Sequence, residues 1–305
     1  MQDGSKKAII AAFFANLGIA VAKFVGFLIT RSASLLAEAG HSVADTGNQA
    51  LLLFGSKRGQ RPADRSHPFG YGPERYFWSF VVALVLFSMG GLFALYEGIQ
   101  KLWHPHEIEN AIVAYVILGV SIALETFSLR TAIKEANHVR GTRSWWTFIR
   151  TAKSPELPVV LLEDIGAEAG LVVALFGLAM AEVTGQPRWD AVGSITIGVL
   201  LVVIAIILAV EMKGLLIGEA ASDDDLAAIR TSIESTPKVN GIIHVRTMHR
   251  GPDNLLVAVK VEYERSLDVP ALAAAIDDTE ARLRAAVPTA DMVYIEPDIR
   301  RTISE

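Results

Sequence analysis

The chain has 305 residues and no cysteine, carries a net charge of −5, and is 51% hydrophobic but only 20% charged. Its mean hydropathy of +0.38 is high for a soluble protein of this length, so a membrane protein is favoured. The absence of cysteine excludes disulfides and thiolate metal sites, which leaves histidine and carboxylates as metal-binding side chains.

Six segments have the roughly 17–25 mostly apolar residues that a membrane-spanning helix needs. They lie at about 8–29, 34–54, 77–99, 111–129, 157–180 and 191–210. No small-residue cleavage site follows the first apolar run, so we predict that it is a retained span and not a signal peptide.

Lysine and arginine are concentrated just before the first span, at Lys6 and Lys7, and in two long connections between spans. The connection after the second span holds Lys57, Arg58, Arg61, Arg65 and Arg75, and that after the fourth holds Arg130, Lys134, Arg140, Arg143, Arg150 and Lys153. The positive-inside rule therefore predicts that both termini and both basic loops are cytoplasmic, in a protein of the cell membrane. Basic loops beside membrane spans are topology signals, and no nucleic-acid partner is expected.

Polar side chains interrupt the second span at steps of three and four positions. This spacing places Glu38, His41, Asp45, Asn48 and Gln49 on one face of a helix. An ionisable side chain at mid-bilayer costs about 2.5–3.5 kcal/mol on insertion scales. We therefore predict that His41 and Asp45 bind a partner inside the membrane.

The fifth span carries three acids. Asp164 and Glu168 are four residues apart and share a helix face, whereas Glu163 lies about 100° round the helix from Asp164. If the polar faces of the two spans meet, His41, Asp45 and Asp164 can approach one ion, with Glu163 or Glu168 as the fourth ligand. Imidazole and carboxylates suit a divalent cation, and tetrahedral N/O coordination suits Zn²⁺.

Polar residues in a membrane also serve simply as hydrogen-bonding links between helices, and we expect that role for Asn16, Asn48 and Gln49. Glu97 and Glu125, in the third and fourth spans, are expected to be structural or proton-linked and not metal ligands.

After the last span the composition becomes that of a small soluble domain. The predicted elements are a helix at 223–233, strands at 241–248 and 255–263 joined by a turn at 251–254, a helix at 270–286 and a strand at 291–296. The predicted fold class is thus an all-α six-helix transmembrane bundle over residues 1–212, followed by a C-terminal cytoplasmic α+β domain (α-β-β-α-β) over 213–305.

Several motifs resemble the cation diffusion facilitator family, in its zinc-transporter branch, and together they cover nearly the whole chain. They are Asn16 and Lys23 in the first span, SLLAEAGHSVADTGNQ at 34–49, HPFGYGPER at 67–75, YEG at 96–98, LIGEA at 216–220 and YIEPD at 294–298. The resemblance implies a homodimeric six-span exporter of a divalent metal, usually zinc, with a metallochaperone-like cytoplasmic domain. It also implies exchange of metal for protons by alternating access, so that the metal is a transported substrate and not a cofactor, and the protein is not an enzyme.

The fifth span departs from the common family motif, in which His or Asp is followed after three residues by Asp. Aligning Asp164 with the last position puts Val160 at the first. The sequence LLED around Glu163 and Asp164, preceded by a long basic loop, is instead similar to the zinc-transporter branch.

The resemblance supports His41, Asp45 and Asp164 as metal ligands. Glu168 is the preferred fourth ligand because it shares the face of Asp164, and Glu163 is the alternative. One histidine with three carboxylates is a harder ligand set than zinc usually has, so Mn²⁺, Fe²⁺ and Co²⁺ stay open as the main substrate.

Two further metal sites of the family fit this chain less well. In the loop after the second span Asp64 and His67 match ligands of a secondary site, but Tyr71 stands where some members have another histidine. In the C-terminal domain His244 and His249 are expected to be surface residues.

Two other functions are alternatives to transport. An intramembrane metal-dependent hydrolase would need a general base, which Glu163 could supply, but the chain has no HExxH-type motif. A non-transporting metal sensor or partner subunit would tolerate loss of the site residues.

Overall fold

The computed structural model describes residues 3–30, 33–104 and 111–300, and within these ranges leaves undescribed the side chains of residues 3, 30, 33–38, 40, 41 and 111. The chain divides into two units, one of residues 1–60 and 74–213 and one of residues 61–73 and 214–305. Each unit is described by itself.

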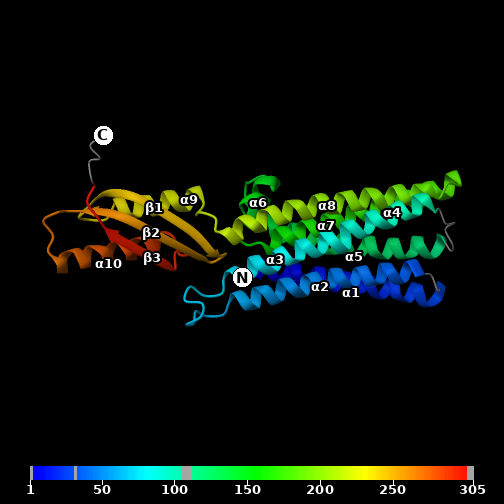
Figure 1. Ribbon diagram of the computed structural model, residues 1–305, viewed down its shortest axis with the longest axis horizontal. Coiled ribbons are helices and arrows are strands. Elements are labelled where there is room, and N and C mark those ends of the chain that lie inside the picture. Colours follow the sequence, from blue (N-terminus) through cyan, green and yellow to red (C-terminus); the bar gives the residue numbers. More distant parts are fainter. Residues whose placement is uncertain (1–2, 31–32, 105–110, 301–305) are drawn as a thin grey trace. The chain divides into compact units, whose positions relative to one another are not determined.

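The first unit is built from long helices (Figure 1). In chain order they are α1 (Asp3–Thr30), α2 (Ala33–Gly59), α3 (Pro73–Val85), the π-helical η1 (Leu86–Leu92), α4 (Phe93–Trp103), α5 (Ala111–Arg140), the short α6 (Trp145–Thr151), α7 (Glu156–Thr184) and α8 (Arg188–Ile217). Helix α1 packs against α2 and α5, and α5 packs against α7. Each of the six predicted spans lies within these helices, the third across α3, η1 and α4.

Four stretches among the described residues are long and apolar enough to cross a membrane: Gly4–Ile29, Pro73–Trp103, Ile112–Arg140 and Arg188–Ile217. Helices α2 and α7 are long enough, but they carry the polar side chains of the predicted site. Neither has a described stretch apolar enough to be counted as a membrane span. That α2 and α7 also cross the membrane, which would give six crossings, therefore stays a prediction.

Glycines bring the backbone of α8 very close to that of η1 and α4. A Cβ added at Gly198 would lie 2.7 Å from the backbone nitrogen of Leu95, and one at Gly98 would lie 2.8 Å from that of Ile195. Only glycine fits at such distances, which is why small residues mark close helix contacts in membranes.

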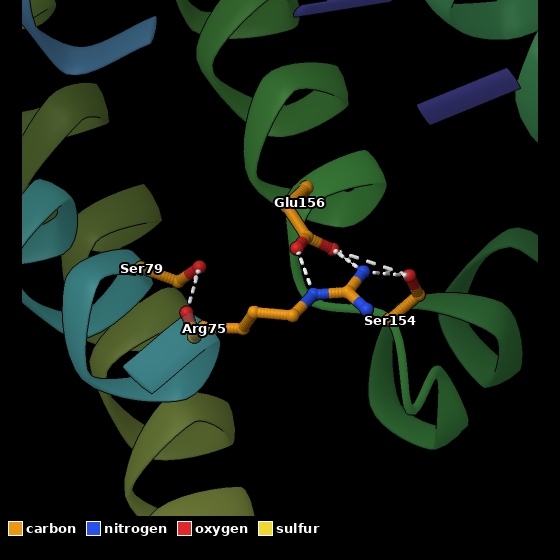
Figure 2. Close-up of polar contacts among 4 residues, drawn as sticks. All are labelled: Arg75, Ser79, Ser154 and Glu156. Carbon is orange, nitrogen blue, oxygen red and sulfur yellow. Dashed lines mark hydrogen bonds and ion pairs between the residues drawn. The ribbon is translucent and has the colours of Figure 1, made fainter. Parts of the chain in front are cut away.

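A buried ion pair joins the start of α3 to the start of α7 (Figure 2). The guanidinium of Arg75 donates to both carboxylate oxygens of Glu156, from Nε at 2.5 Å and from Nη2 at 2.9 Å. Ser154 donates to the same carboxylate at 3.1 Å, and the Arg75 and Glu156 side chains are 3% and 1% exposed. A pair this buried must be fully hydrogen-bonded to be tolerated, and the bidentate geometry meets that need.

The second unit contains α9 (Asp223–Glu234), β1 (Val239–Gly251), β2 (Asn254–Tyr263), α10 (Val269–Ala286) and β3 (Met292–Pro297). This order confirms the predicted α-β-β-α-β pattern. The strands form one sheet in the order β1-β2-β3, with β2 antiparallel to β1 and parallel to β3.

The two helices of this domain start where the sequence places capping residues. Ser222 accepts a hydrogen bond from the backbone nitrogen of Asp225 at the start of α9, and Asp268 accepts one from that of Ala271 at the start of α10. The core is formed by apolar residues of both helices and the sheet, including Ile229, Ile233, Val257, Val259 and Leu283.

Candidate metal site in the membrane domain

The residues predicted to bind metal lie on α2 and α7. His41 falls in α2, but its side chain lies outside the described part of the structure. Asp45, one helical turn later, is partly buried, whereas Glu163 and Asp164 on α7 are buried, at 5% and 0% exposure. The geometry can therefore be built from Asp45 and the α7 acids.

Both carboxylate oxygens of Glu163 are occupied by amide donors from α2. Asn48 Nδ2 donates to Oε1 at 3.1 Å, and Gln49 Nε2 donates to Oε2 at 2.9 Å. Asn16 of α1 in turn donates to Gln49 Oε1 at 3.4 Å. The expectation that these three amides link helices is confirmed, and they hold Glu163 in place.

Asp164 and Glu168 each have one occupied and one unoccupied carboxylate oxygen. Ser128 of α5 donates to Asp164 Oδ2 at 2.7 Å, and Thr126 of α5 donates to Glu168 Oε1 at 2.9 Å. Asp164 Oδ1 and Glu168 Oε2 are buried and have no hydrogen-bond partner among the described residues. A buried oxygen without a partner is costly, so these two atoms are positioned to accept a ligand.

The sequence did not identify Thr126 and Ser128 as site residues. Their only signal was two hydroxyl side chains that flank Glu125 within an apolar span.

Carboxyl groups of α2, α5 and α7 are concentrated in one region of the bundle. Glu125 of α5 is 1% exposed and lies within electrostatic reach of Asp45, Glu163, Asp164 and Glu168. No lysine or arginine of the described residues pairs with Glu125 or with the three α7 acids. Buried carboxylates without a countercharge need protons or a cation.

Asp45, Glu163, Asp164 and Glu168 all lie within electrostatic reach of Glu125, so the four acids share one region of the bundle. Among the side chains that are described, no three His, Cys, Asp or Glu residues are close enough together to hold a metal ion. The full four-ligand set includes His41 and so stays a prediction.

In the loop between α2 and α3, Asp64 is surrounded by donors. Its Oδ1 accepts from the backbone nitrogens of Ser66 at 2.9 Å and His67 at 2.8 Å and from the Ser66 hydroxyl, while Oδ2 accepts from the Tyr71 hydroxyl at 2.8 Å. These bonds, that from Tyr71 first, lower the pKa of Asp64 from 3.8 to about 2 and raise the pKa of Tyr71. His67 Nδ1 is 3.9 Å from Asp64 Oδ1, which is beyond hydrogen-bonding distance.

The two histidines of the second unit differ in exposure. His244 is exposed, as expected, but His249 is only 5% exposed, which corrects the expectation of a surface residue. Its backbone nitrogen donates to the carbonyl of Glu219 at 2.8 Å, so the segment after α8 covers this end of β1.

Comparison with known proteins agrees with this architecture. Residues 9–217 match the family described as "Cation efflux transmembrane domain", and residues 221–298 match "Cation efflux protein, cytoplasmic domain". The chain belongs to the cation efflux family.

Named relatives within the family are transporters and metal tolerance proteins. The chain is 33% identical to a "Proton-coupled zinc antiporter SLC30A9, mitochondrial" of Xenopus laevis, over 86% of this chain and 47% of that protein. It is 30% identical to "Metal tolerance protein C4" of Arabidopsis thaliana, over 87% of this chain and 58% of that protein. It is 25% identical to "Metal cation efflux system protein CzcD" of Cupriavidus metallidurans, over 84% of this chain and 76% of that protein. This cation efflux chain therefore spans about half the length of the first two of these relatives.

Proposed function

We propose that this protein is a secondary active transporter that exports a divalent metal cation in exchange for protons, with Zn²⁺ as its main substrate. Membership of the family supports cation efflux, and the similarity to a proton-coupled zinc antiporter of Xenopus laevis supports zinc as substrate and protons as the exchanged ion. Mn²⁺, Fe²⁺ and Co²⁺ are the alternative substrates, because the ligand set proposed below is rich in hard oxygen atoms.

The observation that carries the proposal is the pair of buried oxygens on α7, Asp164 Oδ1 and Glu168 Oε2, that have no hydrogen-bond partner among the described residues. They lie near the buried carboxyl group of Glu125, for which the described part of the chain offers no lysine or arginine partner. We propose that these two oxygens bind the metal together with His41 and Asp45 of α2. Ser128 and Thr126 would then orient the two carboxylates from behind, as hydrogen-bonded outer partners of metal ligands usually do.

Glu163 is the weaker candidate for the fourth ligand. Both of its oxygens already accept amide hydrogen bonds, so binding a metal through them would require breaking at least one. This hydrogen bonding favours Glu168 over Glu163, which agrees with the order inferred from the helix faces.

Metal binding to imidazole and carboxylates requires these groups in their unprotonated forms, so a site of this kind binds metal or protons in competition. Rocking of the helix bundle around a site near the middle of the membrane would alternate its exposure. The proposal places residues 1–212 in the membrane and residues 213–305 in the cytoplasm, with both termini cytoplasmic, in the cell membrane. Pairing of the C-terminal domain with a second copy would give a homodimer.

The test is metal uptake by proteoliposomes that contain the purified chain and have an acidic interior. A metal-sensitive dye inside reports the entry of Zn²⁺, Mn²⁺, Fe²⁺ or Co²⁺. We expect gradient-driven zinc flux in the wild type and loss of that flux in Asp45→Asn and in Asp164→Asn, two near-isosteric changes that remove the charge and one acceptor oxygen. Asp278→Asn, at an exposed acid of α10, is the matched control and should transport normally.

Flux with another metal and not with zinc would keep the mechanism and change the substrate. Metal flux whose rate does not depend on the proton gradient would exclude exchange of metal for protons. Absence of flux with every metal, from protein that elutes as a folded species, would overturn the proposal in favour of a non-transporting family member.

A further inference from the structure

The connection between α5 and α7 contains the short helix α6, which has one buried and one exposed side. Phe148 and Ile149 are buried, whereas Trp145 and Trp146 are 38% and 55% exposed. Ser144 caps the helix by accepting a hydrogen bond from the backbone nitrogen of Thr147 at 3.1 Å. Two large aromatic side chains are thus exposed on a short helix that is fixed by its cap and by its two buried side chains.

The stretch of sequence that contains α6 carries only positive charges. Residues 136–155 include four lysines and arginines, at 140, 143, 150 and 153, and no aspartate or glutamate. Arg140 and Arg143 donate only to neutral oxygens, namely those of each other's backbone, the carbonyl of Val139 and the side chains of Asn137 and Thr151. No carboxylate of the described residues neutralises either guanidinium. The two positive charges therefore remain available to an anion.

The guanidinium groups lie on the aromatic rings of α6. Arg140 Cζ is 4.4 Å from the ring centre of Trp145, and Arg143 Cζ is 5.9 Å from that of Phe148. A cation–π contact of this kind restrains the guanidinium, and each terminal nitrogen that already donates one hydrogen bond still carries a second N–H. We call Arg140, Arg143, Trp145 and Trp146 the α6 patch.

A second ion pair places α6 at the edge of the apolar part of the bundle. Arg150 Nε lies 3.4 Å from Glu211 Oε1 of α8. Glu211 directly follows the predicted span 191–210, and α7, whose predicted span starts at Leu157, begins five residues after α6 ends. Phospholipid headgroups occupy this level of a bilayer, and tryptophan is enriched there.

We propose that the α6 patch binds the headgroup phosphate of an anionic phospholipid. The guanidinium groups of Arg140 and Arg143 would donate to the phosphate, and the exposed rings of Trp145 and Trp146 would lie among the headgroups beside it. Both the positive charge of the patch and its position beside the membrane helices favour an anionic lipid, because basic surfaces next to membrane helices recognise acidic headgroups.

The experiment counts lipids bound to the purified full-length protein by native mass spectrometry. Phosphatidylglycerol is compared with phosphatidylcholine of the same acyl chains. We expect preferential retention of phosphatidylglycerol, and a roughly tenfold weaker apparent affinity in Arg140→Gln/Arg143→Gln. The matched control is Arg246→Gln/Arg265→Gln, which removes two exposed arginines from the C-terminal domain and should retain the lipid as the wild type does.

A second variant guards against misfolding, because the two arginines also cap backbone carbonyls. Thr142→Asp adds a negative charge at an exposed position and leaves the hydrogen bonds of both arginines in place, so it should weaken binding in the same direction.

Three results would overturn the assignment. The first is equal retention of the two lipids, or unchanged retention in both variants. The second is full displacement of phosphatidylglycerol by inorganic phosphate at constant ionic strength, which would mean a site for free phosphate. The third is a change in oligomeric mass, with lipid retention unaffected, in Arg140→Gln/Arg143→Gln. That outcome would make the patch a contact between copies.

Discussion

Asp164 on α7 receives a hydrogen bond from the Ser128 hydroxyl of α5 at 2.7 Å through one carboxylate oxygen, while its other oxygen is buried without a partner. The same division holds one helical turn further along α7, where Thr126 occupies one oxygen of Glu168. Helix α5 thus fixes the orientation of both acids and leaves the opposite oxygens directed elsewhere.

Ser128→Ala is expected to weaken metal binding without abolishing it. Loss of an outer hydrogen-bond partner of a metal ligand typically costs about 10–100-fold in affinity, because the ligand is no longer held in its binding orientation. Zinc titration of the purified protein measures the change. Thr131→Ala is the control, since the Thr131 hydroxyl donates only to the backbone of its own helix. An unchanged zinc affinity in Ser128→Ala would contradict the assignment of Asp164.

Glu168→Gln and Glu163→Gln should separate two different roles. We expect Glu168→Gln to reduce metal affinity at least as much as loss of an outer partner does, by about 100-fold or more. Glu163→Gln should instead lower thermal stability, because the new side-chain amide cannot accept two amide hydrogen bonds, and an unsatisfied buried group costs about 1–3 kcal/mol. Metal titration and thermal denaturation of both variants show which glutamate binds the metal and which one stabilises the fold. The reverse pattern would make Glu163 the fourth ligand.

Removing one partner of the Arg75–Glu156 pair should destabilise the membrane domain strongly. Arg75→Met leaves the Glu156 carboxylate buried without its countercharge, and breaking a buried pair in this way costs about 3–5 kcal/mol. Arg75→Met/Glu156→Leu should regain much of the loss, because the unpaired charge is gone. The comparison is Arg282→Gln, which breaks the exposed pair with Asp278 on α10 and should cost under about 1 kcal/mol. Thermal denaturation midpoints in detergent report all three, and equal losses in Arg75→Met and Arg282→Gln would refute the prediction.

The Asp64 turn should contribute stability that depends on pH. The pKa of Asp64 is about 2 in the folded protein, against an ordinary value of 3.8, so the unfolded chain binds this proton more tightly. Acid therefore favours unfolding, and the contribution is fully present above about pH 4 and lost as the pH falls toward 2. The difference in thermal midpoint between wild type and Asp64→Asn should narrow across this window. Tyr71→Phe removes the largest cause of the low pKa and should shift the window upward. A difference that does not vary between pH 5 and pH 2 would contradict the prediction.

Local pattern predicted much of the secondary structure. The strand patterns at 241–248 and 255–263 and the turn at 251–254 are properties of short stretches, and the α-β-β-α-β order followed from such local signals. The apolar runs likewise located the long helices. Helix α6 was missed because its seven residues are too few to establish a helical period, and the clearest signal was the cap at Ser144.

The contacts between helices were less accessible to prediction. Spacing placed Asp164 and Glu168 on one face of α7, but which oxygen is occupied depends on Ser128 and Thr126 of another helix. The burial of His249 was likewise not apparent from the local sequence of β1. The π-helical turn of η1 had no sequence signal that we recognised.

The contact of α8 with η1 and α4 bears on how the bundle can move. At Gly98 and Gly198 the main chain of one helix lies directly against Ile195 and Leu95 of the other, with no side chain of its own in between. Sliding one helix past the other would press main-chain atoms against these residues, so we expect these segments to move together. Any rearrangement that opens the carboxylate cluster first to one side and then to the other must therefore occur at the remaining helix boundaries, which are lined by ordinary side chains.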